Sequence, residues 1–512
     1  MDATETEGPR RSLKGRLATG FAAQMFDIAV RLSQSILTVP VLILGWGVEG
    51  YAAWLEAIAL AGVIAGIDFG LAQHFGNRVH LSWTGGDRAL GLRQLRAGLG
   101  LSIGFVAVPV LVVSVVVAMA EADATWSAAL WMLAAAQALH SPRAILLHVY
   151  RAAQRYSLGL VIGSLLSAAQ LALLCAAVWL GLGITGAAAL TLGLTVATCA
   201  ILVVDLRYRF GLTDLSPAAP TRLDLQELRR SMPGFSALIA ANAIIVHGPI
   251  LLLSLMGATA QATVIFSVTR TMANLVRQVI GQFWLTGGNE MAEHKVRGEL
   301  DRLDRIFVQS CRLVMAAGGL CAGLLAAFAP MVVPLWTHGA VPGDPTLLLV
   351  ILAGMVMGAP GQFASLLPTL SNKPHQAVLA QMTWAAGGFI LAAALYGPHG
   401  LLGLALGYAL AETLGAGVQF QQMRRDLPLT TTLKGWVVGF AAFVAVAAVA
   451  GANGLVTQGL ATLHGWVGLG LEAFAALALV APFTLVLMLT AHQRHWLRGQ
   501  ITTRLRRLLA PG

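Results

Sequence analysis

Charged residues are scarce in this sequence. Asp, Glu, Lys and Arg make up 11% of the 512 residues, whereas soluble domains carry roughly 25%. Hydrophobic residues make up 57%, and the mean hydropathy is +0.75. A soluble protein this apolar would expose large adhesive patches, whereas a membrane protein turns such a surface toward lipid. The composition therefore excludes an ordinary soluble domain and predicts a multi-pass membrane protein.

Sequence signals of enzymes and cofactor sites are also missing. The four cysteines lie in apolar runs without a CxxC pair or a partner histidine, so we interpret them as small buried hydrophobic residues. We find no Walker A motif, no HExxH metal motif and no pairing of a nucleophile with a base. The sequence therefore predicts a protein that is not an enzyme and that binds no metal or other cofactor.

Long apolar windows fill most of the chain. At about 20 residues per crossing, they predict an all-α fold with about fourteen transmembrane helices. The first window is too long for the core of a signal peptide, so we expect it to be retained. The windows are 17–46, 50–77, 97–120, 126–149, 158–182, 185–205, 233–256, 260–286, 307–336, 345–370, 376–396, 398–421, 435–456 and 464–490.

Outside the apolar windows, Lys and Arg are confined to alternate loops. With the N-terminus in the cytoplasm, those loops and the two tails lie inside, and the outside loops GVEG, EADAT, THGAVPGDP, YGPHG and ANGLVTQG contain no Lys or Arg. One miscounted helix would invert every later loop, so this pattern predicts an even number of crossings and two cytoplasmic termini. It also accounts for the formal net charge of +10 without a nucleic-acid partner.

The longest polar connection, residues 206–232, divides the windows into six before it and eight after it. Its last part, LDLQELRRSM, is predicted to form a short amphipathic helix on the inner surface. Pro40 and Pro249, each followed by aliphatic residues, form a faint repeat between two lobes. The predicted organisation is a cytoplasmic tail (1–16), an N-lobe (17–205), a cytoplasmic linker (206–232), a C-lobe (233–421), two C-terminal helices (435–490) and a basic cytoplasmic tail (491–512).

The first window carries polar residues on one face. Gln24, Asp27, Arg31 and Gln34 recur every three or four residues, and Asp68 of the next window is expected at a similar depth. Charged side chains inside a membrane tend to face a cavity or a partner. Two interpretations stay open. The residues line a cavity and take part in coupling, or the charged ones form an ion-pair cluster that joins the two windows.

A second one-sided stripe lies in window 260–286. Its members are Arg270, Asn274, Arg277 and Gln278. The window contains no Asp or Glu, so we expect its arginines to lack carboxylate partners and to suit an anionic ligand. Arginine is also the residue whose geometry suits bidentate contact with phosphate. Glu412, in the middle of window 398–421, is a candidate proton or cation site, with a structural role as the alternative.

Several segments resemble one family of transporters. GIDFGL at the end of the second window, the following Asn77 and Arg78, and Gly86-Asp87 are similar to the polysaccharide-export branch of the multidrug/oligosaccharidyl-lipid/polysaccharide (MOP) exporter superfamily. VPVLILGWGVEGYAAW, the stretch RTMANLVRQVIGQFWLTGGNEMAEHKVRGELDRLDRIF and FAPMVVPLWTHG resemble further parts of that family. The resemblance covers roughly residues 15–430, and the family has twelve or fourteen helices.

The resemblance implies an O-antigen (Wzx-type) flippase with a MATE-like fold in the bacterial inner membrane. Such a protein moves a polyprenyl-diphosphate-linked oligosaccharide across the membrane lipids by alternating access between two six-helix lobes, for O-antigen, capsule or exopolysaccharide synthesis. It implies a cationic central cavity in which Arg31 and Arg270 hold the diphosphate or an acidic sugar, with Arg277 below them. Polysaccharide polymerase and assembly proteins are candidate partners. The Asn- and Ser-rich lining of the family is sparse here, so the glycan stays open.

Other functions compete with this one. A cation-coupled multidrug efflux transporter of the same fold would use Asp27, Asp68 or Glu412 to couple to a proton or sodium gradient, although a positive cavity argues against it. A non-transporting scaffold of a glycan-assembly complex is a third hypothesis. A peptidoglycan-precursor flippase is a close variant of the first and is not separable from it by sequence.

Overall fold

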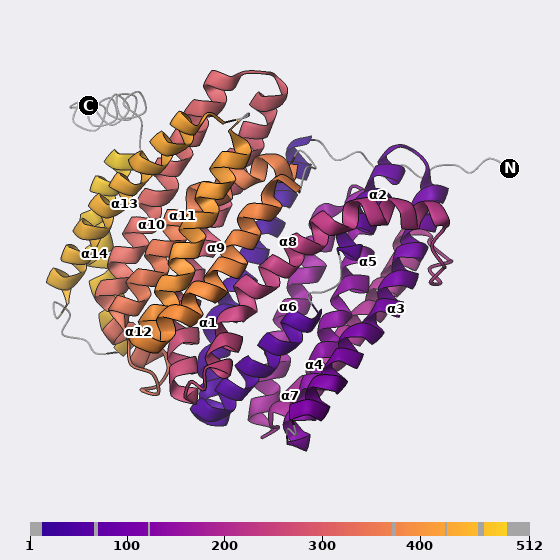
Figure 1. The fold of residues 1–512 in the computed structure, drawn as a ribbon, viewed down its shortest axis with the longest axis horizontal. Helices are drawn as coiled ribbons and strands as arrows, with labels where there is room; N and C mark the ends of the chain where they lie inside the picture. Colours follow the sequence, from indigo (N-terminus) through magenta and orange to yellow (C-terminus); the bar gives the residue numbers. More distant parts are fainter. Residues whose placement is uncertain are drawn as a thin grey trace, which may run out of the picture. The chain divides into compact units, whose positions relative to one another are not determined.

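The computed structural model describes residues 13–65, 70–120, 123–370, 375–424, 427–458 and 465–488. All regular structure within these ranges is helical, which confirms the predicted all-α fold (Figure 1). The helices are α1 (Leu13–Ala65), α2 (Leu71–Thr84), α3 (Arg88–Ala120), α4 (Ala124–Ala138), α5 (His140–Ala152), α6 (Tyr156–Trp179), α7 (Ile184–Phe210), α8 (Arg222–Leu255), α9 (Ala260–Val296), α10 (Leu300–Trp336), α11 (Pro345–Leu370), α12 (His375–Met423), α13 (Leu429–Thr457) and α14 (Gly465–Met488).

Ten of the described helices are long and apolar enough to cross a membrane. The apolar parts of α1 and α12 span 43 and 49 residues, about twice the length that one crossing needs. Each helix breaks at a glycine with a positive φ, Gly47 (70°) in α1 and Gly400 (56°) in α12, a conformation that glycine adopts without strain. Each of these two helices therefore contains residues of two successive predicted windows.

Two predicted windows are each split into two helices. Window 126–149 forms α4 and α5, which meet at Leu139, because Pro142 has no N–H to bond the carbonyl of Ala138. Window 50–77 falls on the second part of α1 and on α2. Asp68 lies between these two helices and outside the described residues.

The chain divides into two compact units. Unit 1 comprises the described residues within Met1–Gly50 and Ala57–Ile239, and unit 2 those within Tyr51–Glu56 and Ala240–Gly512. Helices α2, α3, α5 and α7 enclose a hydrophobic core in unit 1. Its fully buried members include Val79, Leu95, Ile145 and Leu202.

The connection between α7 and α8 is shorter than the predicted linker 206–232. Only residues 211–221 are irregular, because α7 continues to Phe210 and the amphipathic segment forms the first turns of α8. Leu212 and Leu215 of this connection are buried in the core of unit 1. The Nε and Nη2 atoms of Arg96 donate to the carbonyl and hydroxyl oxygens of Ser216, at 3.0 and 2.9 Å. The connection is therefore anchored to unit 1 along its length.

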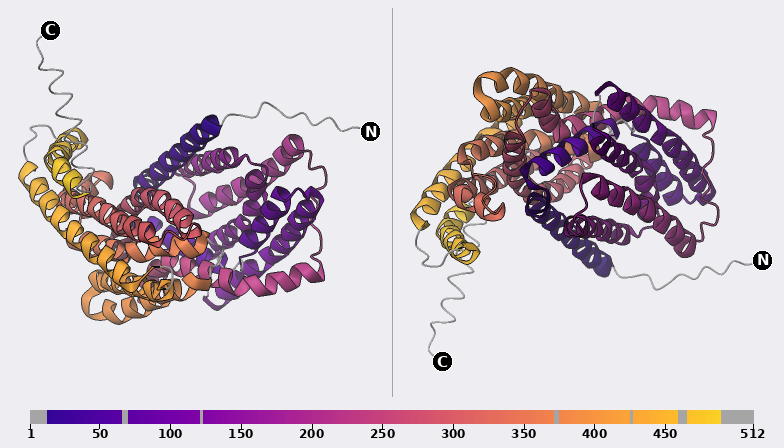
Figure 2. Two further views of the ribbon diagram at one scale, coloured as in Figure 1. Left: turned by 90° about the horizontal axis from the view of Figure 1, so that it is seen from above. Right: turned by 90° about the horizontal axis from the view of Figure 1, so that it is seen from below.

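Glycines set the packing inside unit 2, where α10, α13 and α14 lie side by side (Figure 1 and Figure 2). Gly435 and Gly439 of α13 leave room for Phe307 and Met315 of α10. Small residues in membrane helices allow close approach of the backbones. A second buried cluster joins α10, α11 and α12, with the Phe307 ring stacked on that of Phe363.

Candidate functional site

Small residues on α11 bring α12 close enough to bury a carboxylate. Gly354, Gly358 and Gly361 form a stripe on α11, and a Cβ on any of them would overlap α12. The Cβ on Gly358 would overlap the side chain of Glu412 itself. Glycines three and four residues apart lie on one face of a helix. The sequence of α11 thus provides the space into which Glu412 fits, and Glu412 is only 7% exposed.

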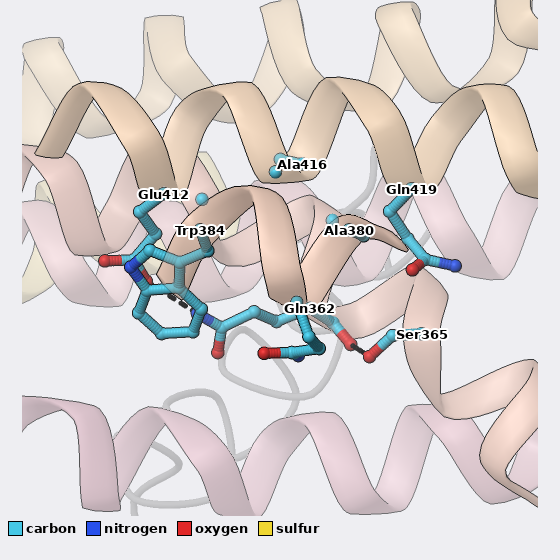
Figure 3. A pocket seen from close by; sticks show the side chains of 11 residues that line it. Gln362, Ser365, Ala380, Trp384, Glu412, Ala416 and Gln419 are labelled. Carbon is cyan, nitrogen blue, oxygen red and sulfur yellow. Dashed lines mark hydrogen bonds between the residues drawn. The ribbon is translucent and has the colours of Figure 1, made fainter. Parts of the chain in front are cut away.

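The Glu412 carboxylate is held by two other helices. Nη2 of Arg277 (α9) donates to Oε2 at 3.1 Å, and Nη1 forms an ion pair with Oε1 at 3.0 Å. Gln362 of α11 donates to Oε1 at 2.6 Å, as Figure 3 shows. The Arg277 guanidinium also lies 5.3 Å from the ring centroid of Trp384, within range of a cation–π interaction. Two contacts from the arginine and one from an amide fix the position of the Glu412 carboxylate, because charge-assisted contacts of this kind are strong and directional.

Arg270, which belongs to the polar stripe of α9 together with Arg277, makes a different contact. Its Nη1 donates to the carbonyl of Val246 at 2.6 Å and its Nη2 to the carbonyl of Ile245 at 2.7 Å. Pro249 has no N–H, so the carbonyl of Ile245 has no partner within α8. Arg270 therefore caps the Ile245 carbonyl that the proline frees and also bonds the neighbouring carbonyl of Val246. Because both acceptors are neutral, the positive charge of Arg270 is not cancelled.

These side chains surround a cavity of about 220 Å³ within unit 2. Helices α8, α9, α11 and α12 line it. The lining includes Asn242, Arg270, Asn274, Arg277, Trp384, Tyr408 and Glu412. Two arginines and one carboxylate give this lining a formal charge of +1. A small polar hollow of about 20 Å³ shares Trp384 and Glu412 with this cavity and is also lined by Gln362, Ser365 and Gln419 (Figure 3).

The stripe predicted in window 260–286 is mostly found at this cavity. Arg270, Asn274 and Arg277 line it, whereas Gln278 is half-buried and does not. The interpretation of Arg277 as a cation without a carboxylate partner is wrong, because its partner Glu412 comes from a helix more than a hundred residues further along the chain. The interpretation of Arg270 as a cation without a carboxylate partner agrees with its contacts to two carbonyl groups.

The polar residues predicted in the first window belong to unit 1. Asp27 is buried, and its carboxylate lies 2.8 Å from Nε of Arg31 and accepts a hydrogen bond of 2.8 Å from Ser164 of α6. The side chain of Arg31 is 62% exposed. Gln24 and Gln34 are half-buried on the same helix. Asp27 and Arg31 therefore form an ion pair within α1, and the hydrogen bond from Ser164 joins α1 to α6.

Sequence reasoning missed Gln362 and Trp384 as parts of the site. Gln362 was detectable as a polar residue within the apolar α11, next to the glycine stripe. Trp384 carries no sequence signal, because tryptophans are common throughout the chain and its contact with Arg277 joins helices far apart in sequence. No three His, Cys, Asp or Glu side chains in the described part of the chain gather as a metal site.

Comparison with known proteins identifies the fold. No protein-family model matches the sequence, and no curated protein resembles it in sequence. Among solved structures, the lipid II flippase MurJ in an inward closed conformation is similar, with a TM-score of 0.65, 11% identity, and coverage of 91% of this chain and 98% of MurJ.

Two further structures are similar. An inward-facing multidrug resistance MATE family transporter of the MOP superfamily has a TM-score of 0.62 at 15% identity, covering 82% of this chain and 98% of its own. A MOP superfamily transporter from Pyrococcus furiosus has a TM-score of 0.51 at 14% identity, covering 84% of this chain and 96% of its own. The chain therefore has the all-α polytopic fold of the MATE and MurJ transporters.

Proposed function

We propose that this protein is a transporter of the MOP superfamily that flips a polyprenyl-diphosphate-linked oligosaccharide across the bacterial inner membrane. The product would enter O-antigen, capsule or exopolysaccharide synthesis, with polymerase and assembly proteins as partners. The observation that carries the proposal is the cavity in unit 2, whose lining holds two arginines and one carboxylate. A positive lining at membrane depth suits an anionic group, and a diphosphate is such a group.

The two arginines would act in different ways. Arg270 is fixed by two backbone carbonyls, so it presents a positioned charge to a phosphate without having to break an ion pair. Arg277 is already paired with Glu412, and its side chain is 29% exposed. A phosphate that reached Arg277 would compete with Glu412 for the same donors. We propose that this competition links arrival of the substrate to release of α12 from α9.

Transport by alternating access and its driving ion also belong to this proposal. The fold is shared with MurJ, a lipid II flippase, and with MATE transporters. Asp27, Glu412 and Asp68 stay candidates for coupling to a proton or sodium gradient. Arg31 stays a candidate contact for the substrate, because its side chain is largely exposed.

The test is translocation of a fluorescent polyprenyl diphosphate oligosaccharide in liposomes that contain the purified protein. The wild type should move the lipid, and Arg270→Gln should lower the rate at least tenfold because the fixed charge is lost. Arg302→Gln is the matched control, since Arg302 is an exposed arginine that is paired with Glu299 on the surface. Movement at the wild-type rate by a folded Arg270→Gln protein would overturn the assignment of the cavity.

Multidrug efflux coupled to a cation is the second candidate, and Glu412 is the observation in its favour. A buried carboxylate at a cavity is what a cationic drug or a coupling ion would need. The bidentate contact with Arg277 counts against it, because the negative charge is already neutralised. Two results together would establish efflux in place of flipping. The same liposomes would extrude cationic dyes in a reaction that Glu412→Gln abolishes, and they would not move the labelled glycolipid.

A further inference from the structure

A further cavity lies between the first four turns of α10 and α13, and it shares no lining residue with the cavity at Glu412. Its volume is about 330 Å³. Its lining consists of Asp304, Arg305, Val308, Gln309, Arg312, Thr431, Lys434 and Val438. All of these residues belong to unit 2 and lie in the first four turns of their helices.

The packing of α10 against α13 determines where this groove lies. Contacts of Gly435 with Phe307, Gly439 with Met315 and Gly323 with Ala447 advance in the same direction along both helices. The two helices are therefore parallel, and both begin at the same end of the pair. The charge pattern of the loops predicts that this end faces the cytoplasm.

Positive charge dominates the groove. Arg305, Arg312 and Lys434 contribute three cations, against the single carboxylate of Asp304. One oxygen of that carboxylate accepts a hydrogen bond of 2.8 Å from the Thr431 hydroxyl, which ties α10 to α13. The first turn of α13 adds the positive end of its helix dipole. Arg305 and Lys434 are exposed, so their charges are open to a ligand.

An apolar strip adjoins the groove on α13. Leu433, Val437, Phe440 and Val444 are 49%, 57%, 38% and 47% exposed, and they follow one another at spacings of three and four residues. Val437 is also one turn from Lys434, which places the start of the strip beside the cationic groove. A molecule with an anionic head and long apolar chains matches this sequence of surfaces, because its head would meet Lys434 while its chains cover the strip.

We infer that this groove binds the phosphate of an anionic glycerophospholipid from the surrounding bilayer. Arg305, Arg312 and Lys434 contact the headgroup, and one acyl chain lies along Leu433, Val437 and Phe440. Basic pockets between membrane helices on the cytoplasmic side bind anionic headgroups in this way. The inference does not depend on the transported substrate, since the described residues that line the groove all come from α10 and α13.

The test uses the full-length protein in detergent and native mass spectrometry with phosphatidylglycerol or phosphatidylcholine of identical acyl chains. We expect phosphatidylglycerol to bind at least tenfold more tightly than phosphatidylcholine. The double variant Arg305→Gln/Lys434→Gln should lose roughly 30-fold in affinity for phosphatidylglycerol, since each interfacial cation contributes about a factor of five. Arg302→Gln, which removes an exposed charge on α10 outside the groove, should bind as the wild type does.

Three results would overturn the inference. Equal binding of the two lipids would show that charge does not select the ligand. Unchanged affinity in a double variant whose thermal unfolding matches that of the wild type would place the bound lipid elsewhere. Displacement of phosphatidylglycerol by glycerol phosphate or by undecaprenyl phosphate at much lower concentration would assign the groove to a free phosphate or to a polyprenyl lipid instead.

Discussion

Two buried carboxylates in this protein are each held by an arginine from another helix, yet their surroundings differ. Glu412 of unit 2 lies in the apolar part of α12 that follows the break at Gly400, and its partner Arg277 lines a cavity. Asp224 of unit 1 is 1% exposed and lies in the first turn of α8, before the apolar part of that helix. Its carboxylate accepts a bond of 3.0 Å from Arg78 of α2.

Asp224 also caps a helix terminus, whereas Glu412 does not. Its carboxylate accepts from the backbone N–H and the hydroxyl of Thr221, at 3.0 and 2.6 Å, and its own N–H donates to the Thr221 hydroxyl at 3.2 Å. This reciprocal arrangement caps the start of α8. The same arginine–carboxylate chemistry therefore closes a helix terminus in unit 1, whereas in unit 2 it leaves donors facing a cavity. Position relative to a cavity, rather than pairing itself, separates a structural ion pair from a candidate binding group.

The largest expected effect comes from breaking the pair in unit 2. Arg277→Ala should lower the free energy of unfolding by about 3 kcal/mol, because it leaves the Glu412 carboxylate buried with Gln362 alone. The double variant Arg277→Met/Glu412→Leu should regain most of that loss, since no charge is left buried. Thermal unfolding in detergent, followed by tryptophan fluorescence, measures both. A double variant no more stable than the single one would contradict this account of the pair.

Replacing Arg270 should have a smaller effect on stability, and a second substitution at Pro249 provides the control. Arg270→Ala should cost about 2 kcal/mol, because the carbonyl of Ile245 is left without a donor and that of Val246 loses one of its donors. Adding Pro249→Ala should restore about half of this loss, since the new N–H can bond the carbonyl of Ile245. Flipping activity should stay lost in both variants, because neither carries the charge. Recovery of transport by the double variant would show that Arg270 acts through the geometry of α8 only.

The cap in unit 1 predicts a pH dependence. Burial opposes ionisation of Asp224, but hydrogen bonds from Thr221 and the charge of Arg78 outweigh it, so the pKa of Asp224 lies below its ordinary value. A carboxyl with a lowered pKa stabilises the fold above the ordinary value, about 4, and this stabilisation is lost as the pH falls through the folded pKa. Arg93, Glu227 and the imidazole of His74 also lie near it.

Asp224→Asn should therefore cost about 1.5 kcal/mol at pH 7 and should flatten the loss of stability on acidification. Melting temperatures of the variant and the wild type between pH 3 and 7 measure both effects. Parallel curves for the two proteins would mean that another group titrates. Glu412→Gln serves as a comparison for the other unit. Because that variant retains the cap of α8, it should keep the loss of stability on acidification that Asp224 causes.

The smallest effect is expected at the pair Asp27–Arg31. Ser164→Ala removes one hydrogen bond to the buried Asp27 carboxylate and should cost about 1 kcal/mol. Ser167→Ala is the matched control on the same helix, because the Ser167 hydroxyl donates only to the backbone carbonyl of Gly163. A loss for Ser164→Ala no larger than that of the control would show that Asp27 depends on Arg31 alone.

Much of the fold was predictable from sequence because it follows from local patterns. Apolar windows of crossing length fix the all-α class and approximate most helices, and the spacing of Arg270, Asn274 and Arg277 places them on one face. The breaks were less predictable. Gly47 and Gly400 break α1 and α12 at a non-helical residue, and Pro142 divides one window into α4 and α5.

What the sequence by itself determined is the membrane environment, the helical class and the identity of the polar residues that must be accommodated within it. The tertiary structure alone decided their partners. Arg277 meets Glu412, and Arg78 meets Asp224, across separations of more than a hundred residues. The physical reason is that periodicity gives the face of a helix, whereas the neighbour on that face depends on close packing. At Glu412 this packing is set by the glycines of α11, whose missing side chains admit the carboxylate.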